Sequence, residues 1–172
     1  LPEGKLILLS LGSLTEVKQP YKLIQVFSLI ARSVSNIMLV VAGRGELLEK
    51  TKKLAEQKGL DNVKFLGYVD HDKDAPALYA CSDYFIMTSK YEGLPLAVLE
   101  AMASGLPCIV SDLTSLRVVD EAKCGIMVNF ANDKDAAQQI ISYLRSEHSN
   151  HGKNAREFMV KNLTWEKLTA TF

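Results

Sequence analysis

The sequence has no long apolar run and no excess of charge of either sign. No stretch of 18 apolar residues occurs, so the chain offers no candidate for a membrane-spanning helix. Twenty basic residues balance twenty acidic ones, and this balance gives no overall field that would favour nucleic acid or an anionic membrane. Any recognition of phosphate groups must therefore be local.

Cysteine is also scarce, and the three that occur argue against a disulfide-stapled secreted domain. Cys81, Cys108 and Cys124 are odd in number and lie among apolar or small residues. They are typical of reduced core thiols. Because the sequence also carries no secretory signal, we expect a cytoplasmic protein.

What the chain does contain is a regular alternation of apolar segments. Continuous apolar runs predict buried strands, and apolar residues at helical spacing predict helices between them. Such alternation indicates βαβ units and a parallel sheet. We expect one α/β, Rossmann-like domain over residues 1–172, with about six mostly parallel strands and helices on both faces. The strands are predicted at 5–13, 36–43, 62–67, 83–89, 107–111 and 124–130. The helices are predicted from residue 18, at 47–59, at 75–81, before Gly105, from about 133, around 155–159, and in a last segment that Thr164 caps and that carries Trp165.

The stretch 92–111, EGLPLAVLEAMASGLPCIVS, is the most informative. Between Leu94 and Val110 every residue is apolar, small or Pro except Glu100. This composition predicts a helix that is buried on nearly all sides, with one carboxylate that needs a partner. The helix follows a predicted strand, and in α/β folds ligands bind in the crevice at that end of the strands. Its free backbone amides are also suited to an anion.

The same stretch resembles a known family. The pattern SxxEGxxxxxLEAMAxGxP, from Ser89 to Pro107, is similar to the Glu-x7-Glu signature of the retaining glycosyltransferases of GT-B fold known as glycosyl transferases group 1. The resemblance implies the donor-binding C-terminal domain of an enzyme that moves a sugar from a nucleoside diphosphate to an acceptor hydroxyl, without a metal ion or other cofactor. It also implies a second, N-terminal domain that binds an unknown acceptor.

We expect that second domain to be missing from this sequence. Since the chain starts without Met and stops in a predicted helix, we expect an excised domain that is inactive alone. The resemblance leaves membrane association through the missing half as an alternative location.

The resemblance also assigns roles to residues. Glu92 is implied to be catalytic, holding hydroxyls of the transferred sugar against the diphosphate, and Glu100 to accept hydrogen bonds from the ribose. The backbone amides of Gly93, Leu94 and Leu96 are expected to face the departing phosphate. The alternative is that Glu92 is a solvated loop acid and Glu100 a surface residue.

The turn after the first strand departs from the family pattern. The family shows Gly-Arg-Leu here, with a Lys five residues after the Arg, and both cations contact the diphosphate. Gly12 and Lys18 fit, but Ser13 stands in place of Arg and Gln19 in place of a usual Gly. A lost charged hydrogen bond costs about 1.5–3 kcal/mol, or roughly ten- to a hundredfold in affinity. As an alternative, Lys18 is simply a lysine in the first turn of a surface helix.

Two further turns complete the candidate donor site. Gly43 and Arg44 follow the second strand, where the family has a glycine-rich turn near the nucleoside. We hypothesise that Arg44 supplies the missing cation. Unchanged affinity for the nucleotide sugar in the Arg44→Ala variant of the complete enzyme would refute this hypothesis. The dinucleotide-binding pattern G-x-G-x-x-G fails because Leu48 occupies its third glycine. Tyr68, after the third strand, could flank the base, or could simply pack.

Other readings of the sequence remain. The segment 70–74, DHDKD, satisfies D-x-D, but Asp is ordinary cap chemistry in such a polar loop, so no metal site is predicted. His71, His148 and His151 form no zinc spacing. The rival functions are a non-catalytic domain of this fold that has lost donor binding, a nucleotide-sugar epimerase of the same fold, and a dinucleotide-dependent oxidoreductase. A nucleotide sugar, and not nucleic acid, is the expected partner.

Overall fold

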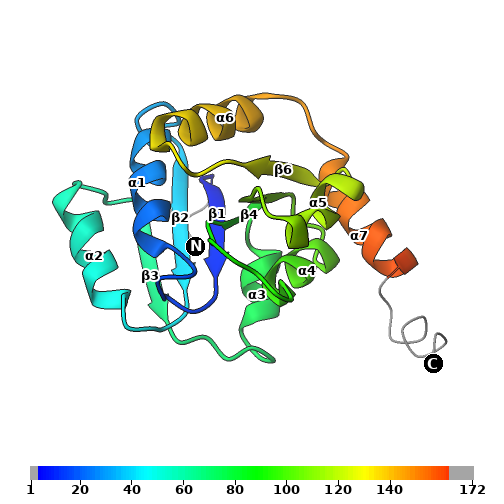
Figure 1. Ribbon diagram of the computed structural model, residues 1–172, viewed down its shortest axis with the longest axis horizontal. Helices are drawn as coiled ribbons and strands as arrows, with labels where there is room; N and C mark the ends of the chain where they lie inside the picture. The colour runs from blue at the N-terminus through cyan, green and yellow to red at the C-terminus, as the bar shows by residue number, and fades with distance from the viewer. Residues whose placement is uncertain (1–3, 163–172) are drawn as a thin grey trace.

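Six apolar segments pair into one sheet in the order β3-β2-β1-β4-β5-β6, and every pair is parallel (Figure 1). The computed structural model describes residues 4–162. Chain order reverses between β1 and β4, which are neighbours in the middle of the sheet. In open α/β sheets this switch point opens a crevice at the carboxyl ends of the strands. The strands are β1 (Leu6–Leu11), β2 (Ile37–Ala42), β3 (Val63–Gly67), β4 (Tyr84–Met87), β5 (Cys108–Ser111) and β6 (Gly125–Val128).

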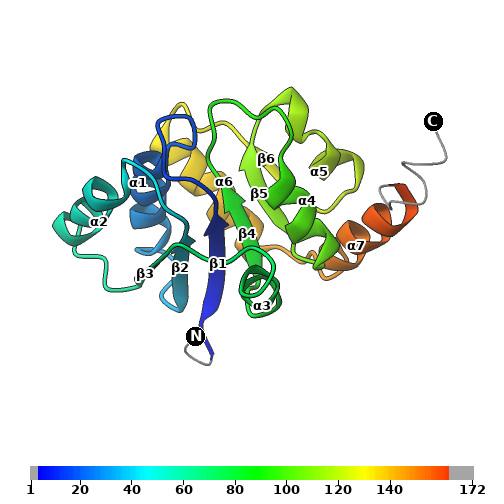
Figure 2. The ribbon, with the colours of Figure 1, turned by 90° about the horizontal axis from the view of Figure 1, so that it is seen from below.

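Helices cover both faces of the sheet, as Figures 1 and 2 show from two directions. The first face carries α1 (Pro20–Ile30), α2 (Leu48–Gln57) and α6 (Asp133–Arg145), and the second carries α3 (Ala75–Ala80), α4 (Leu96–Ala103), α5 (Val118–Glu121) and α7 (His151–Asn162). A short 3-10 turn, η1 (Thr114–Leu116), precedes α5. The Rossmann-like α/β fold predicted from the alternation of apolar segments is confirmed.

The continuous apolar runs of the strands follow from this two-sided cover. In β1, Leu8 packs into the cluster under α1, while Ile7 and Leu9 pack into the cluster on the α4 side. Successive side chains of a strand point to opposite faces, so a strand covered on both faces needs an apolar residue at every position.

The helix α4 differs from the prediction made for it. Its apolar composition predicted burial on nearly all sides, but only Val98, Ala101 and Met102 are fully buried, and Leu96 is 57% exposed. The helix packs on the sheet and on α7, and its other residues are only partly buried. Composition records which residues a helix carries and not how many of its sides are covered, so the prediction of full burial was wrong.

The other boundaries agree with the sequence to within a few residues. The helix after β1 begins at Pro20 rather than Lys18, and the α4 helix ends before Gly105, whose φ of +79° suits a helix-terminating glycine. The single turns η1 and α5 were not predicted. The predicted segment with Thr164 and Trp165 lies outside the described residues. Within residues 4–162 no helix is long and apolar enough to cross a bilayer.

Candidate functional site

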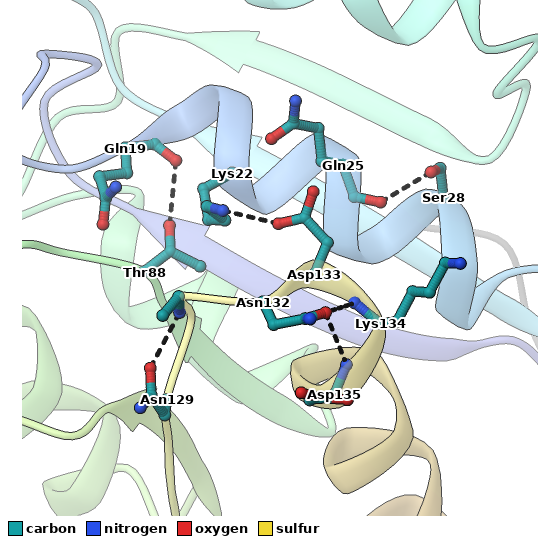
Figure 3. Close-up of polar contacts among 11 residues, drawn as sticks. Gln19, Lys22, Gln25, Ser28, Thr88, Asn129, Asn132, Asp133, Lys134 and Asp135 are labelled. Atoms are coloured by element: carbon teal, nitrogen blue, oxygen red, sulfur yellow. Dashed lines mark hydrogen bonds and ion pairs between the residues drawn. The ribbon is translucent and has the colours of Figure 1, made fainter.

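Two loops meet where β1 and β4 diverge. The β1–α1 loop comprises residues 12–19, and the β4–α4 loop comprises residues 88–95. The Thr88 hydroxyl donates to the carbonyl oxygens of Lys18 and Gln19, at 3.1 and 3.2 Å (the second is drawn in Figure 3). The Lys90 amide donates to the carbonyl of Val17 at 2.8 Å. These bonds join the two loops into one rim of the crevice.

An ion pair between the loops forms the centre of the site. Lys18 Nζ lies 2.6 Å from Glu92 Oε1, although the two residues are 74 positions apart in the chain. Ser89 Oγ donates to the same oxygen at 2.6 Å. The Glu92 side chain is only 6% exposed, so its charge depends on these partners. Glu92 is therefore not a solvated loop acid, and Lys18 lies in the loop before α1 rather than in the first turn of that helix.

The space beside this pair is small. A cavity of about 30 Å³ is bordered by Gly12, Ser13, Lys18 and Ser89, together with apolar residues from the ends of the strands. Such a volume holds one or two water molecules. Both hydrogen bonds to Glu92 reach Oε1, and Oε2 receives none from residues 4–162. One carboxylate oxygen therefore remains able to accept from a ligand hydroxyl.

Glu100 lies on α4 and is held by two side chains, one from α3 on the same face of the sheet and one from the loop before α3. Tyr79 of α3 donates its hydroxyl to Oε2 at 2.9 Å, and His71 Nε2 lies 2.7 Å from Oε1. The hydrogen bond to Glu100 raises the pKa of His71, and burial followed by the Glu100 charge raises that of Tyr79. The Glu100 side chain is 28% exposed, so it is half-buried and partnered rather than a surface residue.

The amides at the start of α4 divide into two kinds. The Leu96 N–H donates to the carbonyl of Leu94 at 2.9 Å, so this amide already has an acceptor within the chain. Pro95, the residue before the helix, has no N–H to offer. The Gly93 and Leu94 amides donate to no acceptor within the described part of the chain. They remain the candidates for an anion.

The glycine turn after β2 is explained by packing within the chain. A Cβ on Gly43 would lie 1.8 Å from the carbonyl oxygen of Gly12, and one on Gly45 would lie 2.3 Å from that of Leu14. The Leu14 amide donates to the Arg44 carbonyl at 3.0 Å. The turn thus supports the loop that carries Lys18, whether or not a nucleoside also lies nearby.

Arg44 and Tyr68 lie together at the carboxyl ends of β2 and β3. Arg44 Cζ lies 4.8 Å from the centre of the Tyr68 ring, which is a cation–π contact. Both side chains are exposed, and Tyr68 is 65% exposed. Arg44 does not border the cavity at Ser13, so its role as a substitute cation stays a prediction.

The D-x-D segment behaves as a turn. Asp70 Oδ1 accepts from the amides of Asp72 and Lys73, at 3.1 and 3.0 Å, which is an Asx turn within the loop. The predicted cap chemistry is not seen at α3, because Asp74, the residue before that helix, makes no capping side-chain hydrogen bond. Across residues 4–162 no group of three or more His, Cys, Asp or Glu side chains is placed to hold a metal ion.

Sequence reasoning missed three members of the site. Ser89 belongs to the quoted pattern, and its place three residues before Glu92 was a signal. Tyr79 and His71 contact Glu100 from 21 and 29 residues away, and no spacing rule reports such contacts.

Comparison with known proteins identifies the family. The family model described as "Glycosyl transferases group 1" matches residues 1–161. The chain is 35% identical to spore coat protein SA of Bacillus subtilis over 180 residues, covering 96% of this chain and 47% of that protein.

Solved structures share the fold. The S. aureus protein TarM, in a complex with UDP among other ligands, superposes with a TM-score of 0.85 at 23% identity, over 98% of this chain and 35% of that one. The C-terminal domain of a glycosyl transferase group 1 family protein from Francisella tularensis superposes with a TM-score of 0.81 at 21% identity, over 94% of this chain and 88% of that one.

The chain therefore spans about half the length of the curated relatives it matches. Its fold is that of the GT-B glycosyltransferase structures on which it superposes. With the family model covering nearly all of the described residues, the chain belongs to the glycosyl transferases group 1 family.

Proposed function

We propose that the chain is the donor-binding half of a retaining glycosyltransferase, which transfers a hexose-type sugar from a nucleoside diphosphate to an acceptor hydroxyl. The observation that carries this proposal is the Lys18–Glu92 pair at the switch point between β1 and β4. It brings a cation suited to the diphosphate and a carboxylate suited to sugar hydroxyls to adjacent positions. The solved complex of TarM contains UDP, which supports a nucleotide of this kind.

In this proposal Lys18 exchanges part of its contact with Glu92 for the diphosphate. Glu92 keeps the hydrogen bond from Ser89 and accepts sugar hydroxyls, so its carboxylate stays satisfied in both states. The Gly93 and Leu94 amides, at the positive end of α4, face the departing phosphate. Lys18 and these amides would neutralise the charge of the leaving group, and for this reason we propose a reaction without a metal ion or other cofactor.

The nucleoside is proposed to extend along the carboxyl edge of β1, β2 and β3. Glu100 would accept from the ribose hydroxyls, and Tyr68 would flank the base while Arg44 contributes positive charge nearby. Gly12, Ser13 and Gly43 would lie beneath the diphosphate and nucleoside, Gly12 and Ser13 at the cavity and Gly43 against the Gly12 carbonyl. The acceptor would bind in a further, N-terminal domain, because the curated relatives are about twice as long as this chain. Cytoplasmic location, with membrane association through that domain as the alternative, belongs to the same proposal.

A thermal-shift screen against nucleotide sugars tests the proposal. UDP-, GDP- and ADP-sugars are compared on the chain and on Glu100→Ala. We expect stabilisation by one nucleotide class, lost in the variant, and no sugar transfer by the chain alone. A chain that no donor stabilises would contradict the proposal, as would stabilisation that survives both Glu100→Ala and Glu92→Ala.

A non-catalytic domain that has lost donor binding is the second candidate. One observation favours it: Ser13 stands where the family has Arg, while Lys18 is neutralised by Glu92. In the screen this candidate predicts no stabilisation by any donor, and Ser13→Arg would then restore it.

A further inference from the structure

The loop 70–74 has no part in the proposed reaction, yet it places a titratable group on the proposed ribose acceptor. His71 Nε2 lies 2.7 Å from Glu100 Oε1, and Tyr79 occupies the other oxygen. Both oxygens of the carboxylate thus already have partners from within the chain. A vicinal diol that binds Glu100 has to share or replace one of them.

The two partners of Glu100 differ in how easily they can be replaced. Tyr79 is 3% exposed and packs between α3 and the sheet, and its hydroxyl also lies 3.2 Å from the carbonyl of Ala97. The His71 side chain is 64% exposed on a loop. His71 can therefore swing into solvent at little cost, and Tyr79 cannot.

We propose that His71 is a positioning residue that closes the ribose-binding carboxylate of Glu100 in the empty site and is displaced when the nucleotide binds. This inference rests on the proposed function of Glu100. It assigns to the segment DHDKD the role of a removable cover for the nucleoside site. Neither the metal motif nor the turn chemistry of that segment implies such a role.

The proposal has a pH signature, because a protonated imidazole holds the carboxylate more strongly than a neutral one. The charged and titratable groups that face His71 are Glu100 from α4, Tyr79 from α3 through that carboxylate, and Asp72, whose Oδ1 lies 3.5 Å from His71 Nδ1. The same loop also carries Asp70, Lys73 and Asp74. Glu100 is the first cause of the raised pKa of His71.

The sign follows from the linkage of protons to binding. In the empty site the pKa of His71 lies above its ordinary 6.5, and displacement from Glu100 lets it fall back. The empty site therefore binds more protons, and a low pH favours it. Donor affinity should rise with pH from about 6.5 through the raised pKa and be flat on either side of that window.

Calorimetric titration of the chain with UDP-glucose, UDP-N-acetylglucosamine and GDP-mannose at pH 5.5 and 8.5 tests this. Nucleotide sugars are suitable because their diphosphate does not titrate in this range, unlike the terminal phosphate of UDP. We expect binding about two- to fivefold weaker at pH 5.5, the range of an exposed ion pair. His71→Gln, which cannot become charged, should bind equally at both pH values, and as tightly as the native chain at pH 8.5.

Two controls separate displacement from a structural effect. Tyr79→Phe alters the fixed partner of Glu100 and should keep the pH dependence. His148→Gln removes a histidine that contacts Tyr84 at the start of β4, at the amino ends of the strands and far from the proposed site. This variant should also keep the pH dependence. Proton release on binding, measured in buffers of different ionisation enthalpy, should be present in the native chain and absent in His71→Gln.

The outcomes are distinct. Binding that is equally tight at both pH values, or a pH dependence that persists in His71→Gln, would overturn this inference and leave the proposed function intact. Absence of binding at every pH would overturn the proposed function and this inference with it.

Discussion

The Lys18–Glu92 pair illustrates how a single residue depends on a partner far away in the sequence. Glu92 is 6% exposed and Lys18 is 30% exposed, so water reaches one end of the pair. The energetic value of such a pair lies mainly in the cost of leaving a buried carboxylate without it. A ligand that takes over Lys18 must therefore leave Glu92 with other partners, as Ser89 allows.

Replacing Lys18 by Met should lower the free energy of unfolding by about 1–3 kcal/mol, less than the loss from a fully buried pair because the lysine is partly solvated. Urea denaturation measures the change. Lys22→Met is the matched control, since Lys22 pairs with Asp133 at the same 2.6 Å but with a carboxylate that is 32% exposed (Figure 3). It should cost less than about 1 kcal/mol.

A double variant makes the test sharper. Lys18→Met combined with Glu92→Gln removes the buried charge together with its partner, so it should recover a large part of the stability lost by Lys18→Met. Losses that simply add would contradict the account of the pair.

Gln19 shows strain at a second single residue. Its φ is +50°, in the left-handed region that costs an L-residue about 1–2 kcal/mol. Gly removes that cost, but it also raises the entropy of the unfolded chain, which lowers the free energy of unfolding by about 0.4–1 kcal/mol. Gln19→Gly should therefore stabilise the chain by about 0.5–1 kcal/mol, as read from the urea midpoint. Gln19→Ala keeps the Cβ and serves as the control; an equal gain from Ala would rule out backbone strain as the cause.

At the residue scale the sequence predicted positions that a local pattern encodes. Glu92, Glu100 and Lys18 stand at fixed spacings from strand ends, and topology brings those ends together. The partners of Glu100 could not be predicted, because Tyr79 reaches it from α3 and His71 from the loop before α3, and no local spacing determines either contact. The engaged amide of Leu96 was missed for a similar reason, since it depends on the geometry of one turn.

At the scale of elements, the loop that carries Lys18 rests on the turn after β2. The backbone of this turn contacts the backbone of the β1–α1 loop at Gly43, which has a φ of +140°. The carbonyl oxygen of Gly12 lies where a Cβ on Gly43 would be. Because both contacting groups are backbone atoms, neither can relieve a clash by changing a side-chain rotamer.

Gly43→Ala should therefore cost about 2–4 kcal/mol of unfolding free energy and disturb the Lys18–Glu92 pair. Gly59→Ala is the control: Gly59 has φ +65° but nothing within 4 Å of its absent Cβ, so only backbone strain of about 1 kcal/mol is expected. Thermal unfolding compares the two variants. Equal losses would mean that the close approach at Gly43 contributes nothing.

The junction of α6 and α7 is a second element-scale feature. The Tyr143 ring stacks on His148 with centroids 4.3 Å apart, and its hydroxyl lies 2.8 Å from His151 Nδ1. Burial, and then the neighbouring His148, lower the pKa of His151. A histidine held in its neutral form therefore ties α7 to α6.

This arrangement predicts the direction of a pH effect on stability. Because the folded pKa of His151 lies below its ordinary 6.5, the unfolded chain binds more protons in that window, and stability falls as pH drops below about 6.5. His151→Gln should flatten this loss in urea titrations at pH 7.5 and 5.5. His71→Gln should not, because the raised pKa of His71 gives stability below 6.5 that is lost as pH rises. An unchanged slope in His151→Gln would contradict the assignment.

Helices and strands could be predicted where a sequence pattern of several residues indicated them. Most strands were visible as apolar runs because two helical layers bury both faces of the sheet, whereas the edge strand β3 includes the exposed Lys64. The turns η1 and α5 span only three and four residues, too few for a helical period to show. The partial exposure of α4 could not be predicted, since its composition is apolar apart from Glu100 while the cover that it receives depends on how the sheet, α7 and Tyr79 of α3 pack against it.

At the scale of the whole molecule, exposed apolar residues gather at the carboxyl edge of the sheet. Val17, Tyr68, Tyr91 and Leu94 lie in the loops of that edge and are 45% to 71% exposed, and Leu96 follows them at the start of α4. The proposed donor site lies among them. The edge thus combines a charged centre with an apolar rim, an arrangement suited to a nucleotide with an aromatic base and a charged diphosphate.

The central claim is that a nucleotide sugar binds at the crevice between β1 and β4. Two-dimensional ¹H–¹⁵N NMR of the chain, titrated with the donor that stabilises it most, tests this directly. The largest amide shifts should fall on residues 12–18 and 92–100, with smaller ones near Tyr68. Shifts confined to the opposite edge of the sheet, or no shift with any nucleotide sugar, would contradict it.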